Sequence, residues 1–350
     1  MKKFDPNAAA AEDSGIFGLP YTVEQAQLII IPVPWEATTS YGGGTAMAPQ
    51  AIFDASKQVD LFDFELGNFY EAGIAMLENP AEISVWNHTA KQEAAKIIKA
   101  AGIINTAELK NSLQRVNELS VKINDYVYQQ TQRWLSQGKC VGILGGDHSS
   151  PFGAVQAFLE HYPEMGILHF DAHADLRSAY EGFEFSHASI MNNIINKTAL
   201  KKLVQVGIRD FCEEEIIFIQ EHSSRITPFY DSVLTDRKLQ GQTWDEVCEE
   251  IIHSLPKQVY ISFDIDGLDP RFCPHTGTPV PGGLDLKEAW YLIKKVGLSG
   301  RKIIGFDLNE VSLGSTKLPE NPDPYSEWDA NVGARLLYKL CGWALNSRLA

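Results

Sequence analysis

Short runs of apolar residues recur along the chain, and each run is bounded by glycine, proline or aspartate. Because the runs are continuously apolar and do not alternate with polar residues, they predict strands that are buried on both faces. Six strands are expected from this pattern, over residues 28–31, 141–144, 166–170, 203–207, 259–263 and 303–306.

Apolar positions between these runs fall at helical spacing. The clearest pattern extends from Leu113 to Trp134, and Gly138 is expected to end that helix. Further helices are expected after Pro151 and from Leu286 onward. Strands that alternate with helices predict an α/β fold with a central, mostly parallel sheet and helices on both faces.

We expect the sequence to form one domain over residues 1–350. It contains no Pro/Ser-rich linker, low-complexity tract or internal repeat that would mark a boundary. The stretch 79–138 is mostly polar and has helical periodicity, so it is expected to be a mainly helical peripheral elaboration.

Composition narrows the classes of partner. The net charge is −15, from 45 acidic and 30 basic residues, and the basic residues do not cluster. This balance argues against a nucleic-acid partner and favours cationic ligands. No apolar run is long enough for a membrane span, and the five cysteines contain no CxxC pair that would suggest a zinc site. We therefore expect a cytoplasmic, reduced protein without a membrane partner.

Three polar segments directly follow predicted strands: residues 145–149, 171–175 and 264–269. In open α/β sheets, ligands bind at the carboxyl ends of the strands. Alternate side chains share a face of extended backbone, so a strand-like segment brings its odd-numbered or even-numbered residues to one point. The side chains expected to meet in this way are those of His148, Asp171, His173, Asp175, Asp264 and Asp266.

Four carboxylates and two imidazoles, without a thiolate, suit Mn²⁺ or a similar borderline metal better than structural zinc. Without cations, the converging carboxylates would repel one another and their pKa values would rise. Because carboxylates can bridge metals, six side chains suffice for two ions roughly 3.5–4 Å apart. Taken singly, each segment could be an ordinary solvated loop, and His148 could cap a helix. The presence of all three segments makes a metal centre the better interpretation.

These segments, in this order, resemble the signature blocks of the ureohydrolase family, which includes arginases, agmatinases, guanidinobutyrases, formiminoglutamases and guanidine hydrolases. The likeness extends from about Leu28 to Leu340 and includes the segments 277–279, 282–283 and 328–335. The resemblance implies a three-layer arginase-like fold and a homo-oligomer, a trimer or hexamer. It also implies two Mn²⁺ ions per chain, with Ni²⁺ as an alternative, bound by His148, Asp171, His173, Asp175, Asp264 and Asp266.

The resemblance also implies roles for three catalytic residues. Glu310 matches the glutamate that binds the substrate, and a carboxylate can hold a planar guanidinium through paired hydrogen bonds. His187 matches a histidine that shuttles protons or orients substrate, and an imidazole that titrates near neutrality suits this task. Asp266 would pass a proton to the departing amine. The expected reaction converts a small cationic guanidinium compound to urea and an amine.

The tail of the substrate distinguishes members of the family. The segment 176–189 and the glycine-rich loop 38–44 resemble agmatinases more than arginases, so agmatine is the expected substrate. Arg177 could attract a substrate with a carboxylate tail, and the presence of Asp210 leaves arginase as an alternative assignment. Guanidinobutyrate, formiminoglutamate and free guanidine remain alternatives. Remoter alternatives are a single-metal hydrolase similar to the deacetylases that share the arginase fold, and a non-catalytic family member.

Overall fold

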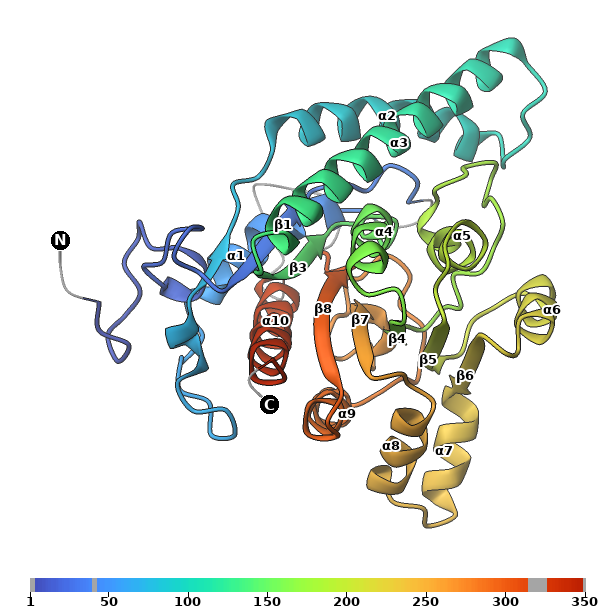
Figure 1. Ribbon diagram of the computed structural model, residues 1–350. Coiled ribbons are helices and arrows are strands. Elements are labelled where there is room, and N and C mark those ends of the chain that lie inside the picture. The colour runs from blue at the N-terminus through green and yellow to red at the C-terminus, as the bar shows by residue number, and fades with distance from the viewer. Residues whose placement is uncertain (1–3, 40–42, 314–325, 349–350) are drawn as a thin grey trace.

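An eight-stranded sheet forms the centre of the molecule (Figure 1). The computed structural model describes residues 4–39, 43–313 and 326–348, and every pairing between strands is parallel. The order across the sheet is β2-β1-β3-β8-β7-β4-β5-β6. The strands are β1 (Leu28–Val33), β2 (Ile74–Met76), β3 (Cys140–Gly145), β4 (Gly166–Phe170), β5 (Lys202–Ile208), β6 (Ile226–Tyr230), β7 (Gln258–Asp264) and β8 (Lys302–Asn309).

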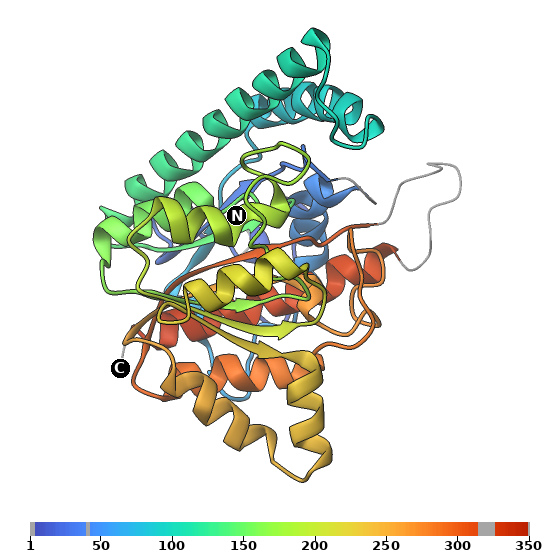
Figure 2. The same cartoon turned by 90° about the vertical axis from the view of Figure 1, so that its right-hand side faces the viewer.

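Helices cover both faces of this sheet (Figure 2). One apolar cluster joins one face to α1, α7, α8, α9 and α10, and a second joins the other face to α2 through α6. The three-layer α/β fold is therefore confirmed. The helices are α1 (Ala48–Ser56), α2 (Ala81–Lys99), α3 (Ala107–Leu135), α4 (Phe152–His161), α5 (Ile190–Lys197), α6 (Glu213–Glu221), α7 (Asp231–Leu239), α8 (Trp244–His253), α9 (Leu286–Leu298) and α10 (Ser326–Asn346).

The six expected strands and three expected helices are present, but two strands escaped the sequence analysis. β2 has only three residues and β6 contains Pro228, and both lie at edges of the sheet. Four of the five residues of β6 are only partly buried, so it lacks the continuously apolar run that marks the inner strands. Edge strands tolerate proline because one side of the strand needs no partner.

The stretch 79–138 is occupied by α2 and α3. The outer part of this helical pair projects from the body of the molecule (Figure 1). The C-terminal half of α3 instead packs on the sheet, where Ile123, Val127 and Trp134 join the apolar cluster of β1 and β3. The helix ends at Leu135, and Gly138 adopts a left-handed conformation just beyond it, as helix ends favour.

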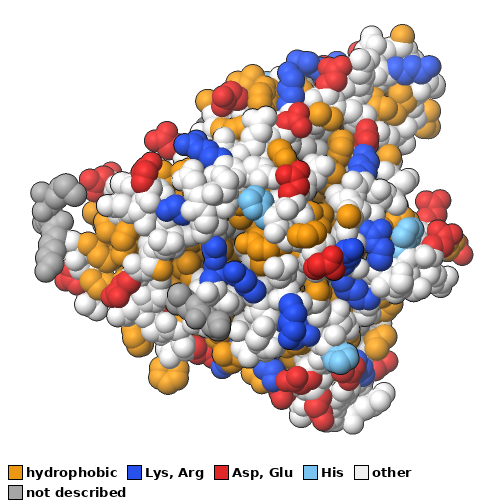
Figure 3. Space-filling model, viewed as in Figure 1, with side chains coloured by type: hydrophobic (Ala, Val, Ile, Leu, Met, Phe, Trp, Pro, Cys, Tyr) orange, Lys and Arg blue, Asp and Glu red, His pale blue; other side chains and the backbone are white. Residues whose placement is uncertain are grey.

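The surface carries mixed charge. Acidic and basic side chains lie interspersed over the face shown in Figure 3. Elsewhere in the described residues, ion pairs join Arg237 to Glu250 and Lys295 to Asp245. In the described ranges, no helix is both long and apolar enough to cross a membrane. Ser40, Tyr41 and Gly42 of the glycine-rich loop lie outside the described residues.

Candidate metal centre

Four adjacent strands, β3, β8, β7 and β4, bring the predicted site residues to one edge of the sheet. Asp171 directly follows β4, Asp264 is the last residue of β7, and Glu310 directly follows β8. His148 follows β3 after a turn at Gly146, where an added Cβ would lie 2.1 Å from the carbonyl oxygen of Trp35. Only glycine permits this close approach, which positions His148.

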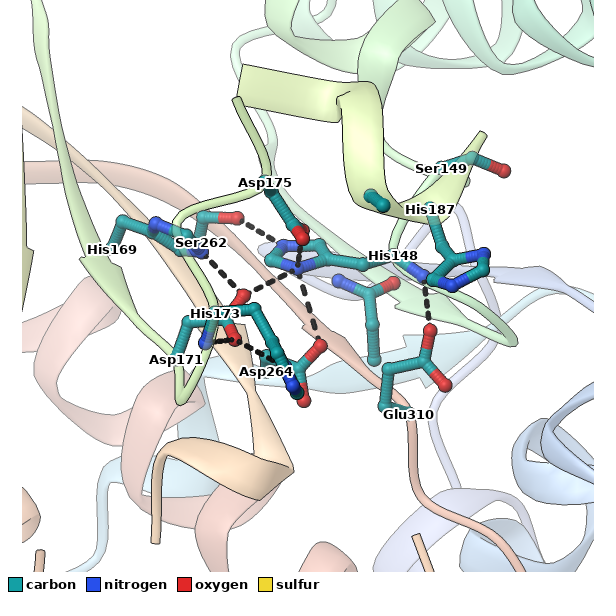
Figure 4. Close-up of polar contacts among 12 residues, drawn as sticks. His148, Ser149, His169, Asp171, His173, Asp175, His187, Ser262, Asp264 and Glu310 are labelled. Atoms are coloured by element: carbon teal, nitrogen blue, oxygen red, sulfur yellow. Dashed lines mark hydrogen bonds and ion pairs between the residues drawn. The ribbon is translucent and has the colours of Figure 1, made fainter. Parts of the chain in front are cut away.

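The first cluster surrounds the imidazole of His148 (Figure 4). Its Nδ1 lies 3.1 Å from Asp171 Oδ2 and 3.2 Å from both Asp175 Oδ2 and Asp264 Oδ2. Its Nε2 lies 2.9 Å from Ser262 Oγ, which donates to a buried carboxylate oxygen of Asp307 at 3.0 Å. Because that hydroxyl donates to Asp307, it accepts from Nε2–H. When the imidazole is neutral, as metal binding requires, Nδ1 therefore carries no proton and can bind a metal.

The second cluster forms around His173 and shares Asp171 with the first. His173 Nδ1 lies 3.1 Å from Asp266 Oδ2 and 3.5 Å from Asp171 Oδ1. The two oxygens of Asp171 therefore face different clusters, as a carboxylate that bridges two metals requires. All six predicted metal ligands are brought together in this way.

Asp175 reaches the first cluster through a local turn. The sequence analysis assumed extended backbone from Asp171 to Asp175, but Asp175 has a left-handed conformation with φ of 55°. Its carbonyl accepts hydrogen bonds from the backbone N–H groups of Met191 and Asn192 at the start of α5. Such a conformation is costly for a residue with a side chain and is found most often at functional sites.

His169 is a site residue that the sequence analysis missed. Its Nε2 lies 2.8 Å from Asp171 Oδ2, and its Nδ1 lies 3.0 Å from the amide nitrogen of Gln205. The amide nitrogen can only donate, so Nδ1 accepts and Nε2–H donates to Asp171. His169 therefore orients a metal ligand instead of binding metal itself. Its spacing of two residues from Asp171 was the signal that could have revealed it.

The pKa values show whether these residues suit divalent cations. Burial and the charge of Asp171 raise the pKa of Asp175 to about 7, and burial with the charges of Asp266 and Asp171 raises the pKa of Asp264 well above its ordinary range. Burial also acts to raise the pKa of Asp171, but His169 and His148 outweigh it and hold this pKa well below the ordinary range. The predicted repulsion among the carboxylates thus raises the pKa of two of them, and bound cations would relieve this repulsion. The donor set fits two divalent metal ions.

Metal binding should therefore stabilise the protein more at high pH than at low pH. Burial lowers the pKa of His173, but Asp266 and Asp171 outweigh it and raise the value to about 12. In the folded metal-free protein, Asp175 holds a proton that the unfolded chain lacks between about pH 4 and pH 7, and His173 holds one between about pH 6.5 and pH 12. The free energy of unfolding of the metal-free protein consequently falls as pH rises. Bound metal ions take the place of these protons, so they offset this loss of stability at high pH.

Thermal unfolding with Mn²⁺ and with a chelator tests this prediction. We expect the metal-dependent rise in Tm to be larger at about pH 8 than at about pH 5.5. An equal rise at both pH values would contradict the proposed ligand set.

Glu310 lies beside the clusters in a cavity of about 170 Å³. Its Oε1 accepts a hydrogen bond of 2.8 Å from the backbone N–H of His148, and its backbone N–H donates to the carbonyl of Gly146. It adopts a left-handed conformation with φ of 61°, another strained position at the site. Burial and the nearby charge of Asp147 raise the pKa of Glu310 well above its ordinary range. A cationic ligand would offset that cost of ionisation.

His187 lines the same cavity and contacts Thr38. Burial, together with the positive charges of His173 and His148, lowers the pKa of His187 to about 4. The expectation that its imidazole titrates near neutrality is therefore wrong in this environment. The ring is neutral at physiological pH, and metal ions in the two clusters would favour the neutral form further.

The outer wall of the cavity carries opposite charges. Arg177 Nε lies 3.8 Å from Glu215 Oε2, and the guanidinium lies 5.1 Å from the ring of Tyr180. Asp210 is 67% exposed at the mouth, with Oδ2 3.9 Å from Nε2 of His173. Arg177 is thus engaged with Glu215, while Asp210 faces the opening.

Comparisons with known proteins agree with this geometry. The arginase family matches residues 26–313. The N(1)-aminopropylagmatine ureohydrolase of Thermus thermophilus is 31% identical over 294 residues, 84% of each chain. The agmatinase of Bacillus subtilis is 28% identical over 301 residues, 83% of this chain and 84% of that one. The agmatine ureohydrolase of Thermoplasma volcanium shares the fold, with a TM-score of 0.70 and 23% identity over 94% of this chain and 93% of that one.

Fold, clusters and relatives together define a metal-dependent hydrolase that acts on amidino C–N bonds. More closely, the chain belongs to the arginase family, and its relatives include ureohydrolases.

Proposed function

We propose that this protein hydrolyses agmatine to putrescine and urea, with two Mn²⁺ ions as the cofactor. The observation that carries the proposal is the pair of His/Asp clusters sharing Asp171 beside Glu310 in one cavity. Relatives of this chain named agmatinase support the choice of substrate.

The metal ions would be held by residues from both clusters. His148, Asp175 and Asp264 would hold one ion and His173 and Asp266 the other, with Asp171 available to both. When bound, two divalent cations supply an acidified water as the nucleophile and stabilise the charge that develops during its attack.

Glu310 binds and orients the guanidinium. A carboxylate can accept two parallel hydrogen bonds from this planar cation, and Glu310 is itself fixed by the N–H of His148. The substrate carbon is thereby held over the metal centre, which replaces a chance encounter by a near-attack geometry.

Asp266 is placed to move a proton. Its Oδ1 is held by the N–H of Ala172 at 3.0 Å, while its Oδ2 faces His173 and the hydroxyl of Thr278. It can accept the proton of the attacking water and deliver it to the departing nitrogen. Addition of the water forms the new C–O bond. The C–N bond to the amine then breaks as the C=O bond of urea forms, and the amine leaves with the delivered proton and takes up the remaining hydroxyl proton as an ammonium ion.

The charges at the mouth favour a cationic tail. Glu215 and Asp210 provide two negative charges and Arg177 provides one positive charge, so this wall is negative by one unit. Since Glu215 neutralises Arg177, Asp210 is the group free to meet the terminal ammonium of agmatine.

Asp210→Asn tests this assignment. We expect it to raise KM for agmatine about tenfold, because one charge-assisted contact is lost, and to leave kcat nearly unchanged. The same variant should bind guanidinobutyrate, which ends in a carboxylate, no worse than the unmodified enzyme. A KM for agmatine within twofold of the unmodified value would exclude Asp210 as the tail contact.

A propylamine-extended agmatine is the second candidate. Relatives from Thermus thermophilus and Synechocystis are named N(1)-aminopropylagmatine ureohydrolase, at 31% and 28% identity. The exposed carboxylate of Asp210 suits a second ammonium at the cavity mouth as well as the first.

A substrate panel distinguishes these possibilities. Urea release is measured with agmatine, N(1)-aminopropylagmatine, arginine, guanidinobutyrate and guanidine, and formamide release is measured with formiminoglutamate. The proposal predicts the highest kcat/KM for agmatine. Activity on none of these compounds would remove every ureohydrolase assignment, and one metal ion per chain would favour the deacetylase-like alternative. We also propose that the protein forms a trimer or hexamer, which light scattering in solution would measure.

A further inference from the structure

Thr38 and His187 meet at the wall of the cavity although 149 residues separate them in the chain. The backbone N–H of His187 lies 3.4 Å from Thr38 Oγ1, and the same oxygen lies 3.3 Å from His187 Nδ1. Thr38 is completely buried. One hydroxyl therefore contacts both the backbone and the ring of His187.

The protons in this contact can be assigned. The backbone N–H can only donate, so Thr38 Oγ1 accepts from it. The single hydroxyl proton is then available for Nδ1, the other polar atom in contact with this oxygen among the described residues. An Nδ1 that accepts carries no proton, and in a neutral imidazole the proton then lies on Nε2. The low pKa of His187 agrees with a neutral ring.

We propose that Thr38 is a positioning residue that fixes the Nε2–H tautomer of His187, so that this N–H donates to the substrate nitrogens after water has added to the guanidinium carbon. The identity of the hydrogen-bond acceptor rests on the proposed function, whereas the tautomer of His187 does not depend on it.

The timing follows from the chemistry of the guanidinium group. Its nitrogens share one positive charge and act only as hydrogen-bond donors. An Nε2–H group finds no acceptor on that ground state. Once the carbon becomes tetrahedral, its nitrogens regain lone pairs and can accept. An interaction made only after addition raises kcat without tightening substrate binding. The opposite tautomer would accept from the guanidinium and lower KM instead.

The loop that carries Thr38 is held by the buried carboxylate of Glu36, two residues before Thr38. Glu36 Oε2 accepts hydrogen bonds from the backbone N–H groups of Gly44 and Ala46 at 2.7 and 3.0 Å. Its other oxygen pairs with Lys91 of α2. A single carboxylate thus ties the beginning and end of the loop that carries Thr38, and connects it to the projecting helical pair.

Kinetics of Thr38→Val and Thr38→Ser test the proposal on whichever panel compound the enzyme cleaves. Valine keeps the shape but removes the hydroxyl, so we expect kcat to fall about tenfold with KM unchanged or lower. Serine restores the hydroxyl and should keep at least half of kcat. Thr39→Val is the matched control, because the Thr39 hydroxyl has no hydrogen-bond partner among the described residues. A kcat of Thr38→Val within twofold of the unmodified enzyme, or an equal loss in Thr39→Val, would overturn the proposal.

Two further variants address the same point without changing Thr38. Glutamine at position 187 places an amide N–H near the position of Nε2, whereas asparagine places it near Nδ1. We expect His187→Gln to retain a higher kcat than His187→Asn. The reverse order, or equal values, would contradict the assignment.

The tautomer can also be observed directly, with no substrate. Nitrogen-15 spectra of the histidine-labelled, metal-free protein distinguish protonated from unprotonated ring nitrogens, and His187→Gln identifies the signals. We expect His187 to be protonated at Nε2 in the unmodified protein and in Thr38→Ser, and to become a mixture of tautomers in Thr38→Val. Protonation at Nδ1 in the unmodified protein would refute the proposal, whatever the substrate proves to be.

Discussion

Replacing Asp171 by asparagine is expected to lower kcat on the order of 10³-fold or more and to leave one metal ion or fewer per chain. Asp171 is the residue that the two clusters share, with one oxygen facing His148 and the other facing His173. Asparagine keeps the shape but removes the negative charge needed to bridge two cations. Metal content by elemental analysis and steady-state kinetics on the same preparation measure both effects.

Asp63→Asn provides the matched control. Asp63 is also a buried carboxylate, but it pairs with Lys339 and does not line the cavity. Its loss should reduce stability while leaving two metal ions per chain and kcat intact. If Asp171→Asn retained both metal ions and near-full activity, the shared carboxylate would not bridge metals, and the proposed centre would be incorrect.

Replacing Glu310 by glutamine is expected to lower kcat/KM on the order of 10²- to 10³-fold, because paired charge-assisted hydrogen bonds to the guanidinium are lost. Glutamine can still accept from the N–H of His148, so the local backbone should be preserved. Kinetics on the preferred substrate measure this loss.

Metal content separates this effect from damage to the centre. Glu310 is not among the side chains that form the two clusters, so Glu310→Gln should keep two metal ions per chain. Loss of metal in this variant would mean that Glu310 is a ligand. Full activity would mean that another group binds the guanidinium.

The order of strands and helices was predictable because the inner strands are apolar on both sides. Runs such as 28–31 have no polar face, and this is typical of a parallel sheet covered by two layers of helices. The exact strand ends were less predictable, because β7 and β8 continue beyond their apolar runs into the polar residues Asp264 and Asn309. Where a strand leaves the core, its residues are no longer apolar, so the apolar pattern no longer marks where the strand ends.

The six proposed metal ligands were predictable from their spacing behind buried strands. Asp175 was expected to reach the cluster through extended backbone. It does reach the cluster, but through a left-handed conformation. The contact of His148 with Ser262 and Asp307 could not be predicted, because it depends on β3, β7 and β8 being neighbours in the sheet. Long-range pairing of this kind has no local pattern.

The electrostatic environment of the site was the least predictable part. His187 follows an ordinary surface-like segment in the sequence, yet burial and neighbouring charge move its pKa to about 4. The proposed role of Thr38 was also unpredictable, because it depends on a contact with His187, 149 positions further along the chain. The sequence gives only the ordinary pKa of each residue type, whereas burial and neighbouring charges in the folded protein determine the shift from that value.

Two divalent cations are proposed to bind side by side between His148 and His173. Anomalous diffraction from crystals of the Mn²⁺-loaded protein tests this proposal most directly. We predict two manganese peaks roughly 3.5–4 Å apart, with Asp171 between them. A single peak, or two peaks too far apart to share Asp171, would contradict the account.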